Sequence, residues 1–399
     1  MKLSIIVTHY RMPDHLRRCL ESLKHVDGDF EVVVVDDGSP AHLRTQASEI
    51  TAQSERARWI ESTENNGVEA AINLGLQNVI GDHVMFRGVD DLFLEKGFTG
   101  LLKHLCSEEV GRVVAGPTKY FRSNANKGIV EGEISGVFER VERDRIDTFL
   151  RGNFLNGGSV VVDTEIARDI GGQSSKLGSF ADLWFNLCLM FQHGLDYLPE
   201  PFTAFRLRSD SYGNTAAARD RTPELEALAE EVGGLSQEHL KSLKASGQLH
   251  FVGAGHLLGE PKCPEDLDPH AYLGPVIRRR MERSGHLMVE WIKEHAEGRL
   301  FVYGAGSMGR WVLRVLREEG FEQVEGFLVT SKTEDAEFEG LSIHSVHEVG
   351  LTEQDLVVIA SKSFEDAMVR TLLEFDPQPM LVPIWDASDG IEERMGDGF

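Results

Sequence analysis

Short apolar runs alternate with amphipathic stretches along the first ninety residues of the chain. Residues 3–8 (LSIIVT) are apolar and rich in β-branched side chains, which is typical of a buried parallel strand. Apolar side chains then recur at helical spacing over residues 13–23, and Pro13 suits the first turn of a helix. The run EVVVVDDGSP (31–40) predicts a central strand that ends in a polar turn.

The alternation continues through the next fifty residues. We expect a helix over about 41–56, a strand at ARWIES (57–62), a helix around 68–79 and a strand at HVMFRGV (83–89). This order of elements predicts a mostly parallel sheet with helices on both faces, which is an α/β fold. Ligands of such sheets bind beyond the carboxyl ends of the strands.

Three polar clusters follow the predicted strands, at Thr8–Tyr10, Asp36–Asp37 and Asp90–Asp91. A single Asp or Asn cluster after a strand commonly only forms a turn. Because the carboxyl ends of parallel strands share one edge of a sheet, three clusters there favour a binding site over three unrelated turns.

The ordered motifs of residues 3–215 resemble those of family-two glycosyltransferases with the GT-A fold. The opening SIIVTHY, the turn VDDGS, a looser Asn-Gly stretch at 66–75, the strand GDHVMFRGVDD and the glycine-rich loop FLNGGSVVVD (154–163) each correspond to a family motif. Each motif alone is weak, but the set in family order is specific. The resemblance implies a GT-A-type nucleotide-binding domain that uses a nucleotide sugar, with a uridine-linked donor favoured.

The resemblance also assigns residues to the donor. Thr8 and Tyr10 would border the base, and Asp36 or Asp37 would accept hydrogen bonds from the base or the ribose. The other positions implied in this way are Asn66, Gly67, Asp90 and Arg208 for the donor, and Asn156, Gly157 and Gly158 for the acceptor-side loop.

A divalent cation is the cofactor that the resemblance implies. Asp90 and Asp91 would hold Mn²⁺ or Mg²⁺ against the donor diphosphate, because these cations accept carboxylate and phosphate oxygens. The family often has a further Asp where this chain has Gly88, and a His where it has Arg208. An arginine cannot ligate a cation but can clamp phosphate oxygens, and a structural salt bridge is equally open for Arg208.

The family places its general base in a Glu-Asp pair at the start of a helix. An inverting transfer needs such a carboxylate to take the proton of the acceptor hydroxyl. In the corresponding segment, 178–194, Asp182 is the only carboxylate and Ala181 replaces the Glu. We assign Asp182 as the base. The structural alternative is a helix-start carboxylate that only complements the helix dipole, with Asp163, Glu165 and Asp210 as the remaining candidates.

The second half of the chain predicts two further segments, so that the expected domains are 1–215, 216–297 and 298–399. Residues 216–297 are rich in Glu, Leu, Ala and Lys and predict a helical accessory or connector segment. Residues 298–399 predict a smaller Rossmann-like domain.

A glycine-rich turn opens that smaller domain. Gly304, Gly306 and Gly309 follow a predicted strand and open a predicted helix, as in G-x-G-x-x-G. The next strand ends at Thr330 instead of the acidic residue that a dinucleotide ribose requires, which disfavours NAD binding. Binding of another nucleotide or a partner, and a purely structural domain, stay open.

Composition narrows the classes of partner. The 399 residues contain 65 Asp and Glu against 41 Lys and Arg, a formal charge of −24, which disfavours nucleic acid and anionic lipid as partners. The four cysteines form no CxxC pair, so neither zinc nor redox chemistry is indicated. No apolar stretch reaches the about 18 residues of a transmembrane segment. We expect a cytoplasmic protein, with a peripheral location at the inner face of the membrane as an option.

The combined prediction is an inverting hexosyl- or N-acetylhexosaminyl-transferase. Its donor would be a nucleoside-diphosphate sugar, its acceptor a saccharide or lipid-linked saccharide hydroxyl, and its setting surface-polysaccharide biosynthesis. One alternative is a non-catalytic sugar-nucleotide-binding protein, because Gly88, Ala181 and Arg208 depart from the family pattern. A second is an NAD(P)-dependent oxidoreductase acting through the glycine loop, although residues 298–399 contain no Tyr-x-x-x-Lys pair. A homo-oligomer is left open.

Overall fold

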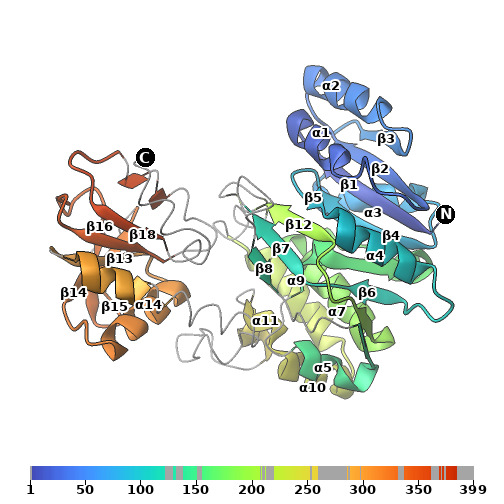
Figure 1. Cartoon of the computed structure of the whole chain (residues 1–399). Helices are drawn as coiled ribbons and strands as arrows, with labels where there is room; N and C mark the ends of the chain where they lie inside the picture. Colours follow the sequence, from blue (N-terminus) through green and yellow to red (C-terminus); the bar gives the residue numbers. More distant parts are fainter. Residues whose placement is uncertain are drawn as a thin grey trace. The chain divides into compact units, whose positions relative to one another are not determined.

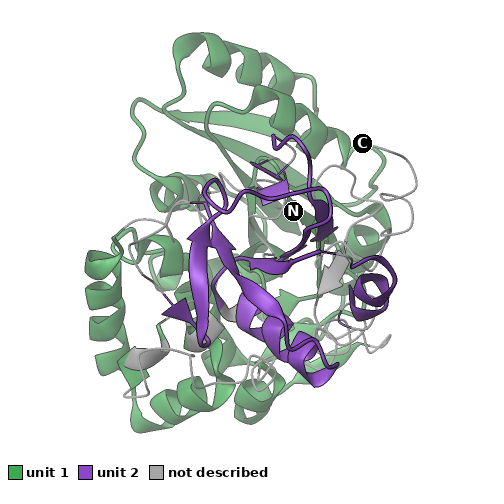
Figure 2. Ribbon diagram, turned by 90° about the vertical axis from the view of Figure 1, so that its left-hand side faces the viewer, with its two compact units in different colours: residues 1–207, 216–263, 272–276 green, residues 208–215, 264–271, 277–399 purple. Residues whose placement is uncertain are grey.

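The structure is a computed structural model that divides into two compact units (Figures 1 and 2). Unit 1 comprises residues 1–207, 216–263 and 272–276, and unit 2 comprises residues 208–215, 264–271 and 277–399. The structure describes residues 2–121, 129–131, 138–150, 155–206, 208, 212, 220–251, 254–258, 285, 288–296, 298–330, 337–360, 368–369, 371–372 and 374–383.

An eight-stranded sheet forms the centre of unit 1, in the order β3-β2-β1-β4-β10-β6-β11-β9. The first four strands of this order are parallel to one another, whereas β10 is antiparallel to both β4 and β6. The strands are β1 (Leu3–His9), β2 (Phe30–Asp37), β3 (Ala57–Ser62), β4 (His83–Gly88), β6 (Val113–Ala115), β9 (Glu139–Val141), β10 (Val160–Asp163) and β11 (Leu195–Tyr197).

Helices cover both faces of this sheet because side chains alternate along the buried strands. In β1, Ile5 and Val7 enter one core and Ile6 enters the other. Helices α1, α2 and α4 contribute to the first core, and α3, α6 and α7 to the second. Their bounds are α1 (Pro13–Glu21), α2 (Ala41–Ala52), α3 (Val68–Asn78), α4 (Glu95–Leu105), α6 (Thr164–Asp169) and α7 (Ala181–His193).

A second sheet of unit 1 has the order β5-β12-β7-β8. Its strands are β5 (Leu92–Phe93), β7 (Thr118–Phe121), β8 (Ile129–Glu131) and β12 (Thr203–Arg206). Because β5 directly follows the Asp90–Asp91 turn and pairs with β12, this sheet brings the chain near residue 206 back to the carboxyl end of β4.

Part of the segment expected to be a connector packs into the core of unit 1. Leu228, Leu243 and Leu249 are fully buried in the same core as α7. Ser236 caps α10 by accepting a hydrogen bond from the N–H of His239. The helices of this part are α9 (Thr222–Gly233), α10 (Gln237–Ser246) and α11 (Gln248–Phe251), and α5 (Ile146–Leu150), which lies earlier in the chain, contributes to the same core.

Unit 2 is built on a six-stranded sheet in the order β15-β16-β14-β13-β17-β18. All neighbours are parallel except β15 and β16, and the order of the five parallel strands is that of doubly wound nucleotide-binding sheets. Trp311 of its helix α14 is buried. The elements are β13 (Leu300–Tyr303), α14 (Ser307–Glu318), β14 (Val324–Val329), β15 (Glu337–Phe338), β16 (Leu341–Ser345), β17 (Leu356–Ile359) and β18 (Met380–Pro383).

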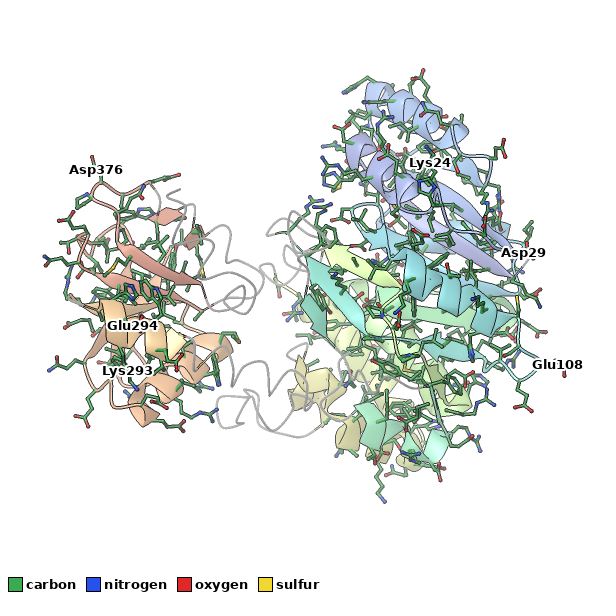
Figure 3. The ribbon with its side chains drawn as sticks, in the orientation of Figure 1. Lys24, Asp29, Glu108, Lys293, Glu294 and Asp376 are labelled. Carbon is green, nitrogen blue, oxygen red and sulfur yellow. The ribbon has the colours of Figure 1, made fainter. Side chains whose placement is uncertain are left out.

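Charged side chains lie mainly on the outside of both units. Figure 3 shows Lys24 and Glu108 projecting from unit 1, and Lys293 and Asp376 projecting from unit 2. Within the described part of the chain, no helix has the length and apolar character needed to cross a membrane.

Candidate functional site

The carboxyl ends of β1, β2 and β4 lie side by side in the main sheet of unit 1. Thr8 is in register with Gly88, and His9 is in register with Asp36. The structure therefore brings the three sequence-predicted polar clusters to one edge, as the parallel order requires. We call this place the donor edge.

Asp36 is a buried carboxylate that connects neighbouring parts of the donor edge by hydrogen bonds. One of its carboxylate oxygens accepts a hydrogen bond from Nδ1 of His9 at 2.7 Å, and the other accepts from the N–H of Ser39 at 2.9 Å. Burial alone would raise the pKa of Asp36, but these hydrogen bonds outweigh it and hold the pKa below its ordinary value. Asp36 is fully buried and supports the edge through these bonds, and its predicted contact with base or ribose stays a prediction.

His9 is a supporting residue to which the sequence reasoning gave no role. Its Nε2 accepts a hydrogen bond from the N–H of Met12 at 3.2 Å, so the ring proton lies on Nδ1 and points at Asp36. The ring is fully buried. A histidine at the end of an otherwise apolar strand, in register with an aspartate on the next strand, is the signal that could have identified this pair.

Asp37 ties the second loop of the donor edge to the sheet. Its two oxygens accept hydrogen bonds from the N–H groups of Asn66 at 2.8 Å and Gly67 at 3.0 Å. Gly67 has φ +92°, a conformation that would be strained for any residue with a side chain, and it immediately precedes α3. Burial raises the pKa of Asp37. Asp37, Asn66 and Gly67 are thus brought together, and their contact with a donor stays a prediction.

Tyr10 offers an aromatic surface at the same edge. Its ring is half-buried, and the guanidinium of Arg11 lies 4.7 Å from the ring centre. Arg11 has φ +61°, an uncommon conformation for a side chain of its size, and its N–H donates to Oγ of Ser39 at 2.9 Å. Thr8 donates to the carbonyl of Arg87 at 3.3 Å. The predicted base contacts of Thr8 and Tyr10 remain predictions.

Asp91 is the counter-ion of a buried arginine. Its Oδ2 lies 2.9 Å from Nη2 of Arg87, and its Oδ1 accepts from the N–H of Arg206 at 2.9 Å. Burial raises the pKa of Asp91 to about 7, so this carboxylate depends on Arg87 to keep its charge. Both of its oxygens are thus engaged inside the protein, which weighs against the predicted role of Asp91 as a cation ligand. Asp90 is half-exposed and is thus the more exposed carboxylate of the pair.

Arg87 was not singled out by the sequence reasoning, although it interrupts an apolar strand. Its side chain is fully buried and also donates to the carbonyl of Ala204 at 3.3 Å. Arg87 lies against the acceptor-side loop, because a Cβ added to Gly158 would sit only 1.7 Å from its Nη1. The loop is closed by Asn156, whose side chain accepts from the N–H of Gly158 at 2.9 Å.

Asp182 lies at the other side of that loop, in the first turn of α7. A Cβ added to Gly157 would meet its Oδ2 at 2.6 Å. The residue is exposed to solvent, yet the surrounding protein desolvates the carboxylate and raises its pKa, and the negative charge of Glu69 adds to that rise. A solvent-accessible carboxylate with a raised pKa can accept a proton from a hydroxyl group.

The contacts just described form one continuous chain from the donor edge to Asp182. Asp91 pairs with Arg87, Arg87 packs on Gly158, and Gly157 packs on Asp182.

Arg208 groups with unit 2, and the residues on both sides of it fall outside the described part of the chain, so its predicted donor contact stays a prediction.

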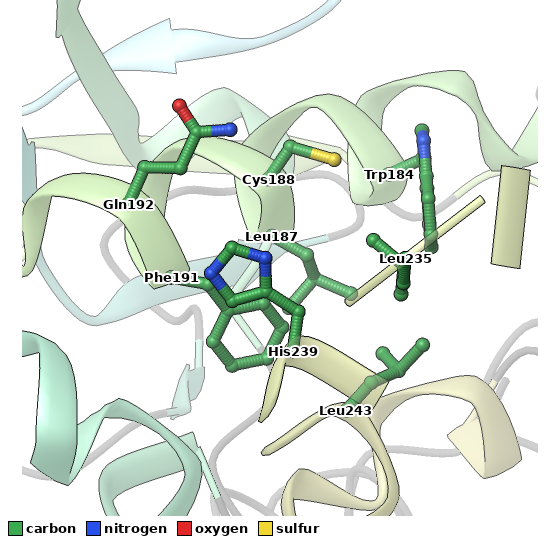
Figure 4. A pocket seen from close by; sticks show the side chains of 8 residues that line it. All are labelled: Trp184, Leu187, Cys188, Phe191, Gln192, Leu235, His239 and Leu243. Atoms are coloured by element: carbon green, nitrogen blue, oxygen red, sulfur yellow. The ribbon is translucent and has the colours of Figure 1, made fainter. Parts of the chain in front are cut away.

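A small hollow between α7 and α10 is separate from these residues (Figure 4). His239 stacks on Phe191 there with ring centres 6.4 Å apart. The walls are mostly apolar and include none of the sequence-predicted site residues. The lining residues are Trp184, Leu187, Cys188, Phe191, Gln192, Leu235, His239 and Leu243.

The glycine loop of unit 2 connects β13 to α14 as expected. Gly304 has φ +120°, and a Cβ on Gly309 would meet the carbonyl oxygen of Gly304 at 2.0 Å, so both positions need glycine. Gly306 immediately precedes α14. Beyond β14, the hydroxyl of Thr330 bonds that of Tyr303 at 2.7 Å, and no carboxylate stands there among the described residues.

This arrangement predicts that the full-length chain does not bind NAD with micromolar affinity. The ribose hydroxyls of NAD need an acceptor at the end of the second strand, and Thr330 is not the acidic residue that usually serves. Calorimetric titration with NAD is the measurement. Saturable binding at micromolar NAD would contradict the prediction and favour the oxidoreductase alternative.

Residues 4–164 match the family model "Glycosyl transferase family 2". The chain is 32% identical over 143 residues to the glycosyltransferase GlyA of Streptococcus pneumoniae. This match covers 35% of this chain and 20% of GlyA. It is 36% identical over 92 residues to the teichoic acid poly(glycerol phosphate) polymerase of Staphylococcus epidermidis, covering 23% and 13% of the two chains. The chain thus spans about a fifth or less of these relatives.

A solved structure with the same fold is S. aureus TarS 1–349 in complex with UDP-GlcNAc. Its TM-score is 0.53 at 18% identity, and the match covers 72% of this chain and 81% of TarS 1–349. At this identity the likeness shows the fold alone, which is α/β and of the GT-A type.

Proposed function

Because residues 4–164 match glycosyl transferase family 2 and lie in a unit with the GT-A fold, we propose that this chain transfers a sugar from a nucleoside-diphosphate sugar to a hydroxyl group. One observation carries the proposal. The contact chain Asp91–Arg87–Gly158–Gly157–Asp182 sets an exposed carboxylate with a raised pKa beside the edge where the nucleotide is expected.

The proposed reaction is a single displacement with inversion. Asp182 accepts the proton of the acceptor hydroxyl while that oxygen forms a bond to the anomeric carbon. The bond from the anomeric carbon to the diphosphate oxygen breaks, and the nucleoside diphosphate leaves with the electron pair. Tyr10 would stack on the base in this proposal, and Asp37 holds the loop of Asn66 and Gly67 at the same edge.

A cation site made of two carboxylates does not fit the described residues. Asp91 is engaged by Arg87 and by the backbone of Arg206, and Asp90 is the more exposed carboxylate of the pair. Among the described residues, no group of three or more His, Cys, Asp or Glu side chains could hold a metal ion. No step of the proposed reaction is therefore assigned to Mn²⁺ or Mg²⁺.

The donor and the setting belong to the proposal as well. A uridine-linked hexose or N-acetylhexosamine is the donor that we propose, and the UDP-GlcNAc complex of TarS makes UDP-GlcNAc the first compound to test. The likeness to a teichoic acid polymerase supports a saccharide or lipid-linked saccharide acceptor in surface-polysaccharide biosynthesis.

A panel of nucleotide sugars tests the function directly. We expect the full-length chain to release UDP from a UDP-sugar, slowly to water and faster with a saccharide acceptor, because a bound acceptor hydroxyl is held close to the anomeric carbon. Chromatography of the released nucleotide is the measurement. Saturable binding of UDP-sugars without release under any acceptor would favour the non-catalytic alternative. If no nucleotide sugar binds, the proposed function is wrong.

A further inference from the structure

Four charged residues at the carboxyl end of β4 form a balanced group, which we call the β4 cluster: Arg87, Asp90, Asp91 and Arg206. Arg87 pairs with Asp91 at 2.9 Å. Nε of Arg206 donates to the backbone carbonyl of Asp90 at 3.0 Å, and its guanidinium lies 4.4 Å from the ring centre of Phe121. The cluster thus holds two positive and two negative side chains at the place where a cation-binding doublet was expected.

Asp91 cannot turn toward a ligand without breaking internal bonds. It is 4% exposed, and its oxygens are occupied by Arg87 and by the N–H of Arg206. The guanidinium of Arg87 already supplies the positive charge that a bound cation would otherwise bring to this carboxylate. Removing Asp91 from Arg87 would leave a buried guanidinium without its counter-ion, which is strongly unfavourable.

Gly88 leaves open the position from which a third carboxylate would reach the cluster. A Cβ built on Gly88 points at the two aspartates, 3.0 Å from Oδ1 of Asp90 and 3.4 Å from Oδ2 of Asp91. Its φ is not in the positive region, so the backbone at this position would not strain a side chain. An aspartate would therefore be accommodated at position 88 with shifts of a few tenths of an ångström, and the glycine contributes no ligand.

We propose that donor binding at this edge does not require a divalent cation, because a positive charge, Arg87, is built into the chain beside Asp91. The inference rests on the proposed function, which supplies the nucleoside-diphosphate ligand. Cation affinity depends on the number of charged oxygen ligands, and the β4 cluster has no net negative charge to offer.

Arg87 has donor groups left over for this role. Its Nε and Nη1 have no hydrogen-bond partner among the described residues, although the side chain is fully buried. Charged groups buried in this way are normally fully paired, and a low-dielectric surrounding strengthens their effect on a nearby anion. Nη1 lies against Gly158 of the acceptor-side loop, so that only the backbone of this loop covers it.

The first test compares UDP and uridine binding to the full-length chain by calorimetry, in excess EDTA and in excess Mg²⁺ or Mn²⁺. We expect the UDP affinity to change by no more than about threefold, because too few charged ligands are present to hold a cation. UDP binding that appears only with a cation would overturn the inference and leave the proposed function standing. Failure of both UDP and uridine to bind under every condition would reject both.

The second test adds the missing ligand. Gly88→Asp should raise affinity for Mn²⁺ alone, followed by electron paramagnetic resonance, by at least about tenfold, since one more charged oxygen ligand joins Asp90. Gly100→Asp is the matched control, because it adds the same charge on α4 where a new Cβ meets no other atom. Tight Mn²⁺ binding by the wild type that neither variant changes would show that the wild-type edge already holds the cation, against the inference. Absence of Mn²⁺ binding by Gly88→Asp would show that a missing ligand at position 88 is not what keeps the cation away, which also counts against the inference.

The third test removes the built-in charge. Arg87→Met combined with Asp91→Asn leaves no unpaired buried charge, and the amide oxygen of the new side chain could still accept from the N–H of Arg206. We expect the ratio of UDP affinity to uridine affinity to fall by at least about tenfold in this double variant. That is the usual contribution of a charge-assisted interaction. Unchanged uridine affinity shows that the edge is intact. An unchanged ratio of UDP to uridine affinity would assign Arg87 a merely structural role.

Discussion

Asp182→Asn is expected to lower the turnover of sugar transfer by about 10²–10⁴-fold, the usual contribution of a general base. Asparagine keeps the size of the side chain and can still accept the hydrogen bond from the N–H of Leu183, which the carboxylate receives at 2.7 Å. It cannot accept a proton. Affinity for the donor should stay near that of the wild type, because the base touches the acceptor. Initial rates and donor titrations on the same preparation are the measurements.

The pH dependence of turnover provides an independent check on Asp182. Its pKa is raised, first by desolvation and then by the charge of Glu69, above the ordinary value of an aspartate, about 3.9. A base acts only when ionised, so activity should be present above the raised pKa and fall as the pH drops through it. This acidic limb should be absent from the residual activity of Asp182→Asn.

Asp27→Asn is a matched control for this prediction. Asp27 is exposed and precedes β2, at the opposite edge of the sheet from the site, so its loss should leave turnover unchanged. Wild-type turnover in Asp182→Asn would show that Asp182 is only a helix-start carboxylate. The base would then be sought among Asp163, whose side chain caps α6, Glu165, and Asp210, which lies outside the described residues.

Arg87→Met is expected to destabilise the protein by about 3–5 kcal/mol, the cost of breaking a buried ion pair from one side. The reason is that Asp91 would keep its buried position but lose the charge that balances it. Methionine fills a similar length of apolar space, so lost packing should contribute little. Urea denaturation followed by circular dichroism measures the change in the free energy of unfolding.

Two further variants separate charge from packing in that result. Arg87→Met with Asp91→Asn should be more stable than Arg87→Met alone, because no unpaired charge is left in the interior. Lys96→Met breaks an ion pair to Glu200 whose side chains are 86% and 45% exposed, and it should change stability by less than about 1 kcal/mol. A double variant as unstable as Arg87→Met would mean that the loss comes from packing instead of charge.

The predicted fold is confirmed, and its best-predicted elements are those with the longest patterns. The strands expected at 3–8 and 57–62 are Leu3–His9 and Ala57–Ser62, and the helix expected at 68–79 is Val68–Asn78. Strands such as β6 and β11 were not predicted. Each has three residues, which is too short for an alternating pattern to show.

The residues of the candidate site were predictable as a group, but their individual roles were not. Local sequence shows that Asp36 and Asp37 follow a buried strand, so both must lie at the donor edge. It does not show that His9 on the neighbouring strand donates a hydrogen bond to Asp36, or that the backbone of Asn66 and Gly67 donates to Asp37. These bonds join residues 27 to 30 positions apart, and they depend on strand order and register.

By itself, the sequence determined the α/β architecture, the shared edge where the polar clusters meet and the position of Asp182 at a helix start, because hydrophobic periodicity and turn residues act over short stretches of chain. Only the tertiary structure decided that Asp91 pairs with Arg87 and that Arg87 touches the loop beside Asp182. Asp91 also accepts a bond from Arg206, 115 residues away. Whether a carboxylate is free to bind a ligand depends on which buried charges the fold places against it, and that is a property of packing between distant segments.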